Sequence, residues 1–208
     1  TGVLAQALPV SSTVTKANAF AIKGEPFEIS ENFGKGLKAS PFRGAGAMQN
    51  GEVFTAEVTP SYGGPFATLG DVLVPEAEVP EAFFIDEDKL GRWEYFKGAK
   101  KEERTHSSGY TYLYSEGGMA FPDALDKPSR TILTGEGGAG ASRTKHVVKT
   151  ESGRYRRLVP DELDQLQTFP KGWTDAGMTD GNRAFCMGNA LVVSVVHRIG
   201  EEIAKRAE

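Results

Sequence analysis

Two segments, RYRRLVPDELDQLQTFPKGWT (residues 154–174) and NRAFCMGNALVVSVVHRIG (residues 182–200), decide how this chain folds. In the first segment, Pro160 suits the first turn of a helix, where its missing N–H costs no hydrogen bond. The two acidic residues after it lie where the helix dipole favours negative charge. Leu163 and Leu166 are spaced to share one face, and residues 169–172 end the helix with Pro and Gly. The segment therefore predicts a short amphipathic helix.

The second segment predicts a longer helix from about residue 183 to residue 204. Small residues open it, and an apolar run with helical spacing follows. Basic residues stand in its last turn, where the helix dipole favours them. The apolar residues that keep this spacing are Leu191, Val195, Val196 and Ile199.

Composition limits the classes of protein to which the chain can belong. With 208 residues it forms one domain or two small ones. Its net charge is −4, so any contact with nucleic acid has to come from local basic patches. The single cysteine excludes an internal disulfide and fits a reducing compartment. The sequence has no apolar run near the roughly 20 residues of a membrane helix, and TGVLAQALPV does not read as a signal peptide.

The order of particular residues in the two segments is more specific for a protein family than their apolar periodicity is. The pattern RRL-x-P-x-E-x-x-x-LQ-x-FP-x-x-WT, followed after a gap by GNA-x-x-V-x-V, resembles the ninth and tenth conserved motifs of the DNA (cytosine-5) methyltransferases. A generic helix pair would explain the apolar spacing but not these residues in this order. The resemblance spans roughly residues 15–205 and corresponds to the C-terminal part of such an enzyme.

This resemblance implies an α/β methyltransferase of which only the C-terminal portion is present. We expect a β-rich, loop-rich target-recognition domain and two C-terminal helices that pack on a Rossmann-like catalytic domain. The expected divisions are an N-terminal segment (residues 1–30) with one strand of the catalytic region, the recognition domain (31–153) and the two motif helices (154–208). The eighth motif of the family is only weakly matched, because TKAN stands where its Gln and Arg would be.

Several shorter elements follow from local patterns. We expect strands at residues 19–22, 53–58 and 83–85. The glycines of FRGAGA superficially resemble the family's cofactor motif, but a hairpin fits better because a strand-like alternation follows them. In residues 68–73, Asp71 is expected to cap a helical turn. Tyr110, Tyr112 and Tyr114 alternate and should line one face of a strand.

The groups that carry the family's chemistry are missing from these residues. The resemblance implies a cysteine nucleophile in a Pro-Cys dipeptide and an acid in Glu-Asn-Val, and neither string occurs. Cys186 lies within the tenth-motif match, and we interpret it as a small packed residue at a helix start. We therefore predict no catalytic residue on this chain, no metal site, and no activity of the chain alone. It is the small subunit of a split enzyme, our preferred interpretation, or a fragment of a longer chain, or a stand-alone DNA-binding relic.

The resemblance also implies candidate binding residues. The tenth motif puts Gly188, Asn189 and Ala190 beside the cofactor, S-adenosylmethionine. The ninth-motif residues Glu162 and Gln167 are expected to be structural. Basic residues and a Gly-rich loop that lacks the ending of a nucleotide P-loop supply candidates for contact with duplex DNA. These candidates are Lys97, Lys100, Lys101, Arg104, Arg130, Thr131, Gly137, Gly138, Arg143, Lys145 and Arg157. For the cluster at residues 97–104, a solvated surface helix is an equally good interpretation.

The second predicted helix also suggests a partner. Apolar residues occur on more than one of its faces, so it needs neighbours all round. We expect a large apolar interface with the catalytic half, although cover by the β-rich recognition domain is an alternative. The predicted function is recognition of a DNA target and completion of the cofactor site, for methylation of cytosine carbon 5 in a bacterial cytoplasmic restriction–modification system. A non-catalytic DNA-binding module and an interaction domain without a DNA role are the competing classes.

Overall fold

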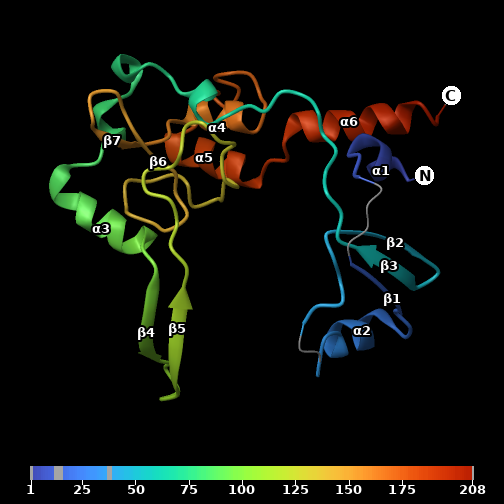
Figure 1. Ribbon diagram of the computed structural model, residues 1–208. Helices are drawn as coiled ribbons and strands as arrows, with labels where there is room; N and C mark the ends of the chain where they lie inside the picture. Colours follow the sequence, from blue (N-terminus) through green and yellow to red (C-terminus); the bar gives the residue numbers. More distant parts are fainter. Residues whose placement is uncertain (1, 12–15, 37–38, 208) are drawn as a thin grey trace. The chain divides into compact units, whose positions relative to one another are not determined.

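The computed structural model describes residues 2–11, 16–36 and 39–207, and the chain divides into two compact units (Figure 1). The first unit comprises Thr1–Gly64 with His197–Glu208, and the second comprises Pro65–Val196. The divisions expected from the sequence, by role in the family, stay a prediction. The expected boundary at residue 30 falls inside a helix, and the one at residue 153 falls in the turn between two paired strands.

The first unit is built on a small antiparallel sheet. Its elements are the helices α1 (Val3–Ala7) and α2 (Pro26–Asn32) and the strands β1 (Ala17–Ala21), β2 (Ala45–Gln49) and β3 (Glu52–Ala56). The strand order is β1-β3-β2, so β3 is central, and alternate residues of β3 are buried. The strands predicted at residues 19–22 and 53–58 are thus confirmed as β1 and β3, within one to two residues at each end.

The predicted hairpin is confirmed as the β2–β3 pair, but its turn is not at the FRGAGA glycines. Asn50 and Gly51 form the turn, and both have positive φ, at 50° and 79°. An Asn-Gly pair suits such a turn because its backbone twist matches that of the two strands. Gly51 is also required by space, since a Cβ there would lie 2.6 Å from the carbonyl oxygen of Ile22. Gly46, one of the glycines expected in the loop, instead lies within β2.

The second unit holds most of the regular structure in short pieces. Three 3₁₀ turns, η1 (Gly70–Val72), η2 (Glu76–Glu78) and η3 (Glu81–Phe83), precede helix α3 (Glu87–Lys97). Two separate two-stranded antiparallel sheets follow, β4 (Lys100–Thr105) with β5 (Thr111–Glu116), and β6 (Val147–Lys149) with β7 (Tyr155–Arg157). Helices α4 (Pro160–Leu166) and α5 (Asp180–Asn189) and the start of α6 (Val193–Ala204) complete it. The expected β-rich character is limited to these small sheets.

Two local predictions in this unit are corrected. Residues 83–85 do not form a strand, because the N–H groups of Phe83 and Phe84 turn back to the carbonyls of Pro80 and Glu81, and Phe84 makes only an isolated bridge to Arg156. Asp71 lies inside η1 and is not its N-cap. Its carboxylate accepts from the backbone N–H and hydroxyl of Thr68, at 2.7 and 2.9 Å, and so holds the entry to the turn.

The core of the second unit gathers around the ninth-motif helix, α4, whose Leu163 is one of its buried residues. Helix α4 packs on α5 and on η1, and its start at Pro160 is as predicted. A second, smaller cluster lies beneath the 3₁₀ turns. The main cluster contains Leu69, Ile132, Val148, Leu158, Leu163, Ala184 and Met187, and the smaller one Val79, Phe83 and Val159.

The single helix predicted from residue 183 to residue 204 is wrong, because the helix is interrupted after Asn189. The Gln167 side chain donates to the carbonyl oxygen of Met187 at 2.8 Å and to that of Ala190 at 3.4 Å. The backbone N–H of Val193 in turn donates to the carbonyl of Gln167 at 3.0 Å. These bonds draw the end of α5 onto the end of α4, so that α6 begins again only at Val193. In the described parts of the chain, no helix is long and apolar enough to cross a membrane.

Candidate functional site

A buried group of charges ties helix α3 to the loop that precedes β6. The Lys97 ammonium, with only 1% of the side chain exposed, donates to the carbonyl oxygen of Lys145 and lies 3.9 Å from a carboxylate oxygen of Asp123. Arg130 donates to both oxygens of the same carboxylate, at 2.7 and 3.1 Å. The N–H of Val147 also donates to Asp123, at 2.8 Å. Asp123 therefore acts as the shared acceptor of the group.

Burial has opposite consequences for the two partners in this group. Burial lowers the pKa of Lys97 to about 8, although the charge of Asp123 acts in the other direction. Burial would raise the pKa of Asp123, but the hydrogen bonds from Arg130 and Val147 outweigh it and hold that pKa below its ordinary value. The carboxylate is thus stable in its charged form, whereas the ammonium carries a desolvation cost.

The Gly-rich loop is folded onto two more buried polar side chains. Glu136 accepts from the backbone N–H of His146 at 2.6 Å and lies 3.1 Å from its ring Nδ1. The Lys145 ammonium donates to the carbonyl oxygens of Gly138 and Gly140, at 2.9 and 2.8 Å. Burial, and next the nearby Arg157 charge, lower the pKa of Lys145. The loop therefore has a defined shape, which its own buried charges impose.

The ninth motif contributes a buried ion pair. Arg156 donates to both carboxylate oxygens of Glu162, at 2.9 and 2.7 Å, and the two side chains are 2% and 0% exposed. Glu162 also accepts from the backbone N–H of Val159 and of Val74, each at 2.9 Å. It thereby satisfies the first turn of α4 and fixes the segment before η2, as its predicted structural role requires. Gln167, which holds the α5–α6 junction, has the second structural role that was predicted.

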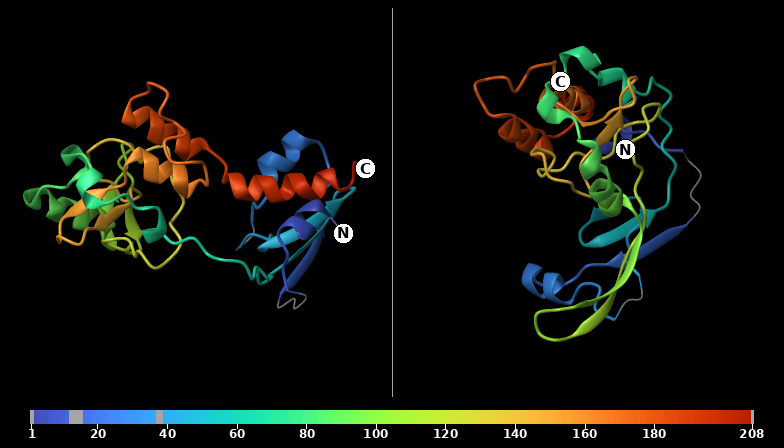
Figure 2. Two further views of the ribbon diagram at one scale, coloured as in Figure 1. Left: turned by 90° about the horizontal axis from the view of Figure 1, so that it is seen from above. Right: turned by 90° about the vertical axis from the view of Figure 1, so that its left-hand side faces the viewer.

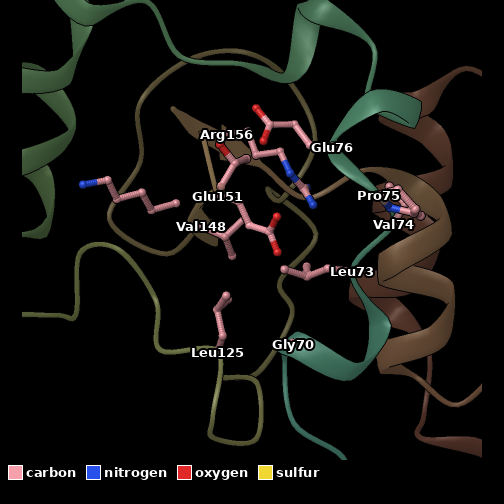
Figure 3. Close-up of a pocket in the computed structure, with 11 residues that line it drawn as sticks. Gly70, Leu73, Val74, Pro75, Glu76, Leu125, Val148, Glu151 and Arg156 are labelled. Atoms are coloured by element: carbon pink, nitrogen blue, oxygen red, sulfur yellow. The ribbon is translucent and has the colours of Figure 1, made fainter. Parts of the chain in front are cut away.

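A cavity of about 440 Å³ lies beside this ion pair (Figure 3). In that view Arg156 and Glu76 lie toward one end of the cavity and Gly70 and Leu125 toward the other. The Nε atom of Arg156 is buried and has no hydrogen-bond partner among the described residues. The cavity was not anticipated from the sequence, because its walls come from three separated stretches. The residues that line it are Gly70, Leu73, Val74, Pro75, Glu76, Leu125, Val148, Lys149, Thr150, Glu151 and Arg156.

Three of the basic residues predicted to contact DNA, Lys97, Lys145 and Arg157, are buried in this structure. The ammonium groups of Lys97 and Lys145 donate to backbone carbonyl oxygens. The guanidinium of Arg157 donates to the carbonyl oxygens of Gly138 and Ala82, at 3.0 and 2.6 Å, and lies over the ring of Phe83. Burial lowers the pKa of Arg157. These three cations stabilise loops of the protein and do not face solvent.

The remaining candidates differ in how far they reach solvent. Lys101 is exposed, and 41% of the Arg104 side chain is accessible. Lys100 is mostly buried, because its ammonium lies against Glu116 at 3.3 Å and the carbonyl of Phe96 at 3.1 Å. The cluster is neither a surface helix nor a loop. Apart from Lys97 at the end of α3, its residues belong to strand β4.

The second group of candidates surrounds the Gly-rich loop. Thr131 and Gly138 are exposed, whereas Gly137 packs on α5, where a Cβ would lie 3.1 Å from the Cα of Gly181. The guanidinium of Arg130 is engaged in hydrogen bonds to the carboxylate of Asp123. Arg143 donates to Glu116 at 3.2 Å and to the carbonyl of Gly117 at 2.6 Å, with 27% of its side chain exposed. Of this group, Thr131, Gly138 and part of Arg143 are open to a ligand.

The three cofactor candidates stand at the end of α5. Gly188 packs directly on the backbone of the loop at Leu133 and Thr134, since a Cβ there would lie 2.3 Å from the backbone N of Thr134. Asn189 is exposed, and its side-chain N–H donates to the carbonyl of Phe185 at 3.0 Å. Ala190 is half-buried and its carbonyl accepts from Gln167. The glycine thus serves internal packing, and Asn189 is the member that presents itself to solvent. Cys186 is half-buried against the main core cluster, so it is packed as predicted, but it lies in the second half of α5 and not at a helix start.

An apolar surface adjoins these residues. The side chains around the α5–α6 junction are too exposed to be part of the core of the second unit. Leu191, which directly follows the cofactor candidates, is 73% exposed. The others at the junction are Val193, Val195 and Val196.

Sequence reasoning missed the acceptors that bury the cations. Asp123 lies in a turn-rich stretch with no motif around it, and Glu136 stands in a Gly-rich loop with no feature that marks it as an acceptor. The signal for the aromatic face of β4–β5 was present in the alternation of Tyr110, Tyr112 and Tyr114. That prediction is confirmed for Tyr112 and Tyr114, which are alternate residues of β5. Tyr110 lies one residue before the strand, and its ring stacks on that of Tyr112 with centroids 6.4 Å apart.

Comparison with known proteins bears on the chain as a whole. The model of the family "C-5 cytosine-specific DNA methylase" matches residues 74–205. Type II methyltransferase M.Sau3AI of Staphylococcus aureus is 38% identical over 206 residues, which is 98% of this chain and 47% of that protein. The chain thus spans about half the length of the curated relative it matches.

A solved structure, that of the methyltransferase EhMeth of Entamoeba histolytica, overlaps 92% of this chain and 55% of its own. Its sequence identity is 12% and its TM-score 0.47, which is too low to establish a common fold.

Proposed function

Because the chain belongs to the C-5 cytosine-specific DNA methylase family, we propose that it is the target-recognition and cofactor-wall portion of a DNA (cytosine-5) methyltransferase. The observation that carries the proposal is that the family match, residues 74–205, spans both stretches that resemble the ninth and tenth motifs, whereas Pro-Cys and Glu-Asn-Val are absent from the sequence. Arg156, Glu162 and Gln167 then act as the scaffold that joins the recognition loops to the cofactor wall.

In this proposal the cofactor is S-adenosylmethionine, which supplies the methyl group when bound. The residues at the end of α5 fit one wall of its site. Asn189 is exposed and keeps its side-chain oxygen for a ligand, since its N–H is used within the helix. Gly188 fits only indirectly, because Leu133 and Thr134 occupy the space above it. The role of this chain is to hold Asn189 and Ala190 in place through the side chain of Gln167.

Duplex DNA is the proposed substrate, and the exposed candidates of the second unit are the proposed contacts. Lys101, Arg104 and Arg143 offer positive charge, and Thr131 with Gly138 offers small groups at the loop surface. Phosphate contacts position a protein on DNA and base-edge contacts specify the sequence, and this set contains groups suited to both. Since the enzyme must extrude its target base to reach carbon 5, small residues near the base leave it room.

The catalytic groups come from a portion of the methyltransferase outside these 208 residues. We favour a second polypeptide, with this chain as the smaller subunit, and a continuous longer chain is the alternative. The exposed apolar side chains at the α5–α6 junction are the proposed interface, because an obligate interface is large and apolar. A restriction–modification system in the bacterial cytoplasm is the proposed setting.

The test is transfer of a labelled methyl group from S-adenosylmethionine to duplex DNA. The 208-residue chain is assayed alone and together with the catalytic portion, taken from the adjacent reading frame. We expect activity only in the mixture, at least about tenfold lower with Asn189→Ala, and unchanged with Asn182→Ala, an exposed asparagine of the same helix.

Two results would contradict the proposal. Activity of the chain alone would place a nucleophile on it, and Cys186 would be the first suspect. If the mixture shows no methyl transfer but the chain binds DNA in a salt-sensitive way, the chain would instead be a non-catalytic DNA-binding module.

A further inference from the structure

Strands β4 and β5 form a ribbon that extends from the second unit without a covering layer. Figures 1 and 2 both show it pointing away from the rest of that unit. The two strands pair along their full length, from Lys100 opposite Glu116 to Thr105 opposite Thr111. No other described helix or strand packs closely on them. A two-stranded hairpin of this kind is marginally stable in water, so the ribbon needs either internal stacking or an outside partner.

One face of the ribbon carries stacked aromatic and basic groups. The rings of Tyr110 and Tyr112 are nearly parallel, with an interplanar angle of 7°. The Arg104 guanidinium lies 3.5 Å from the centroid of the Tyr114 ring, and Lys100 follows at the base of the same face. Tyr110 is 68% and Tyr112 is 37% exposed, so the aromatic groups stack on each other but are not buried.

The Arg104 side chain is fixed by contacts within the ribbon, and part of its guanidinium remains available to a hydrogen-bond acceptor. Its Nε and one terminal nitrogen, Nη2, donate to Glu102, at 2.9 and 2.6 Å. The hydrogen bonds raise the pKa of Arg104, so it stays charged. Within the described residues its other terminal nitrogen, Nη1, makes no hydrogen bond. An arginine that is stacked on a ring and tied along one edge has already lost most of the freedom that binding would cost it.

From this geometry we propose that the β4–β5 ribbon enters the major groove of duplex DNA with its aromatic face toward the base edges, and that Arg104 reads a guanine there. The inference rests on the proposed function and names the element and the residue that carry out target recognition. The major groove, about 12 Å wide, admits a two-stranded β-ribbon, whose strands lie about 4.8 Å apart. Arginine on guanine O6 and N7 is the commonest specific contact in that groove.

The charge on this face favours a polyanion over a protein strand as the occupant. Lys100, Arg104 and Arg143 lie on or beside it, and their acidic partners, Glu102 and Glu116, are already ion-paired to them. The face is therefore positive by one charge on a chain whose net charge is negative. Exposed tyrosines supply contact area next to the bases, at little cost in conformational entropy.

The opposite face of the same ribbon offers a matched control. Glu103 and Leu113 face each other across the strands on that side, and both are exposed. Changes there alter the ribbon to a similar extent without touching the aromatic face. Ser115→Ala and Leu113→Ala, which change exposed residues of that face without changing its charge, are therefore the reference variants.

The experiment is selection of bound duplexes from a pool of randomised sequence, with the 208-residue chain and its variants. We expect the unaltered chain and the two reference variants to enrich the same sequence. Arg104→Gln is expected to lose the preference for guanine at one position, and Tyr110→Ala with Tyr112→Ala to weaken binding at least about fivefold. Replacing that guanine by 7-deazaguanine, which lacks the N7 acceptor, should weaken binding by the unaltered chain about tenfold and by Arg104→Gln hardly at all. Circular dichroism verifies that each variant is folded.

The two possible failures are distinguishable. If the chain binds DNA and selects a sequence, but Arg104→Gln selects the same guanine, or a minor-groove ligand displaces the chain, the ribbon proposal is overturned and the proposed function stands. If the chain alone and with its catalytic portion shows no salt-sensitive DNA binding, both are overturned.

Discussion

The loops of the second unit and the β4–β5 ribbon use the same kinds of side chain for opposite purposes. In the loops, Lys97, Lys145 and Arg157 are buried and donate to backbone carbonyls. In the ribbon, Lys101 and Arg104 reach solvent, and the charges that pair there do so at the surface. Burial makes a charge costly unless it is fully satisfied, whereas an exposed pair contributes little. Stability should therefore depend on the loop charges, and binding on the ribbon charges.

The largest effect should come from the shared acceptor of the buried group. Asp123→Asn leaves Lys97 and Arg130 without their counter-charge, and we expect unfolding to become easier by about 3–5 kcal/mol. Urea denaturation measures the change, and Asp126→Asn, an exposed residue nearby, is the control. A loss below about 1 kcal/mol would mean that the buried group does not hold the loops.

A smaller effect is expected where α5 meets the loop after Ile132. Gly188→Ala puts a methyl group 2.3 Å from the backbone N of Thr134, so one of the two segments must shift. We expect a loss of about 1–3 kcal/mol in the free energy of unfolding. Gly91→Ala in α3, with open space around it, should gain up to about 1 kcal/mol. Equal behaviour of the two variants would contradict the close packing.

The third effect depends on pH. The pKa of Lys97 in the folded protein, about 8, is below its unfolded value of 10.5, so the unfolded chain binds more protons between these values. The stability contributed by this group is present above the unfolded pKa and is lost as pH falls through the folded one. Between pH 7 and 9.5 the unaltered protein should therefore gain about 2 kcal/mol relative to Lys97→Met. Denaturation of both proteins across this range measures the difference. If the free energy of unfolding changed equally with pH in both, the lowered pKa of Lys97 would be refuted.

The smallest effect should be found on the ribbon. Leu113→Ala removes an exposed side chain from a strand that no layer covers, so stability should change by less than about 0.5 kcal/mol. Leu163→Ala, at 1% exposure in the main core cluster, should cost about 2–5 kcal/mol. Thermal unfolding of the pair measures both, and a large loss with Leu113→Ala would indicate that the ribbon is integral to the core.

Elements that depend on neighbouring residues were predictable from the sequence. Helix α4 begins at Pro160 and strand β3 occupies the expected stretch, because a helix start and an alternating strand are encoded locally. The break between α5 and α6 was not predictable. The apolar periodicity continues across it, and the side chain that causes it, Gln167, lies at the end of another helix, directly after α4.

The candidate site divides in the same way. Motif order was sufficient to identify the family and the structural roles of Glu162 and Gln167. It was not sufficient to separate Lys97 from Lys101, which stand in one basic stretch. What separates them is Asp123, whose position depends on how the loops fold. To predict that a cation is buried, one has to know which group accepts its hydrogen bonds. For Lys97 that group, Asp123, is distant in sequence.

The close approach of Gly188 to Leu133 and Thr134 sets a rule for building chimaeras of such proteins. The loop that carries Thr131 and the end of α5 that carries Asn189 fit each other with no room for a single added carbon. A donor loop grafted from a relative will seat only if its backbone follows the same path past residue 188. Loop and helix end should therefore be exchanged together, whereas the β4–β5 ribbon can be exchanged if Arg143, which pairs with Glu116, is kept.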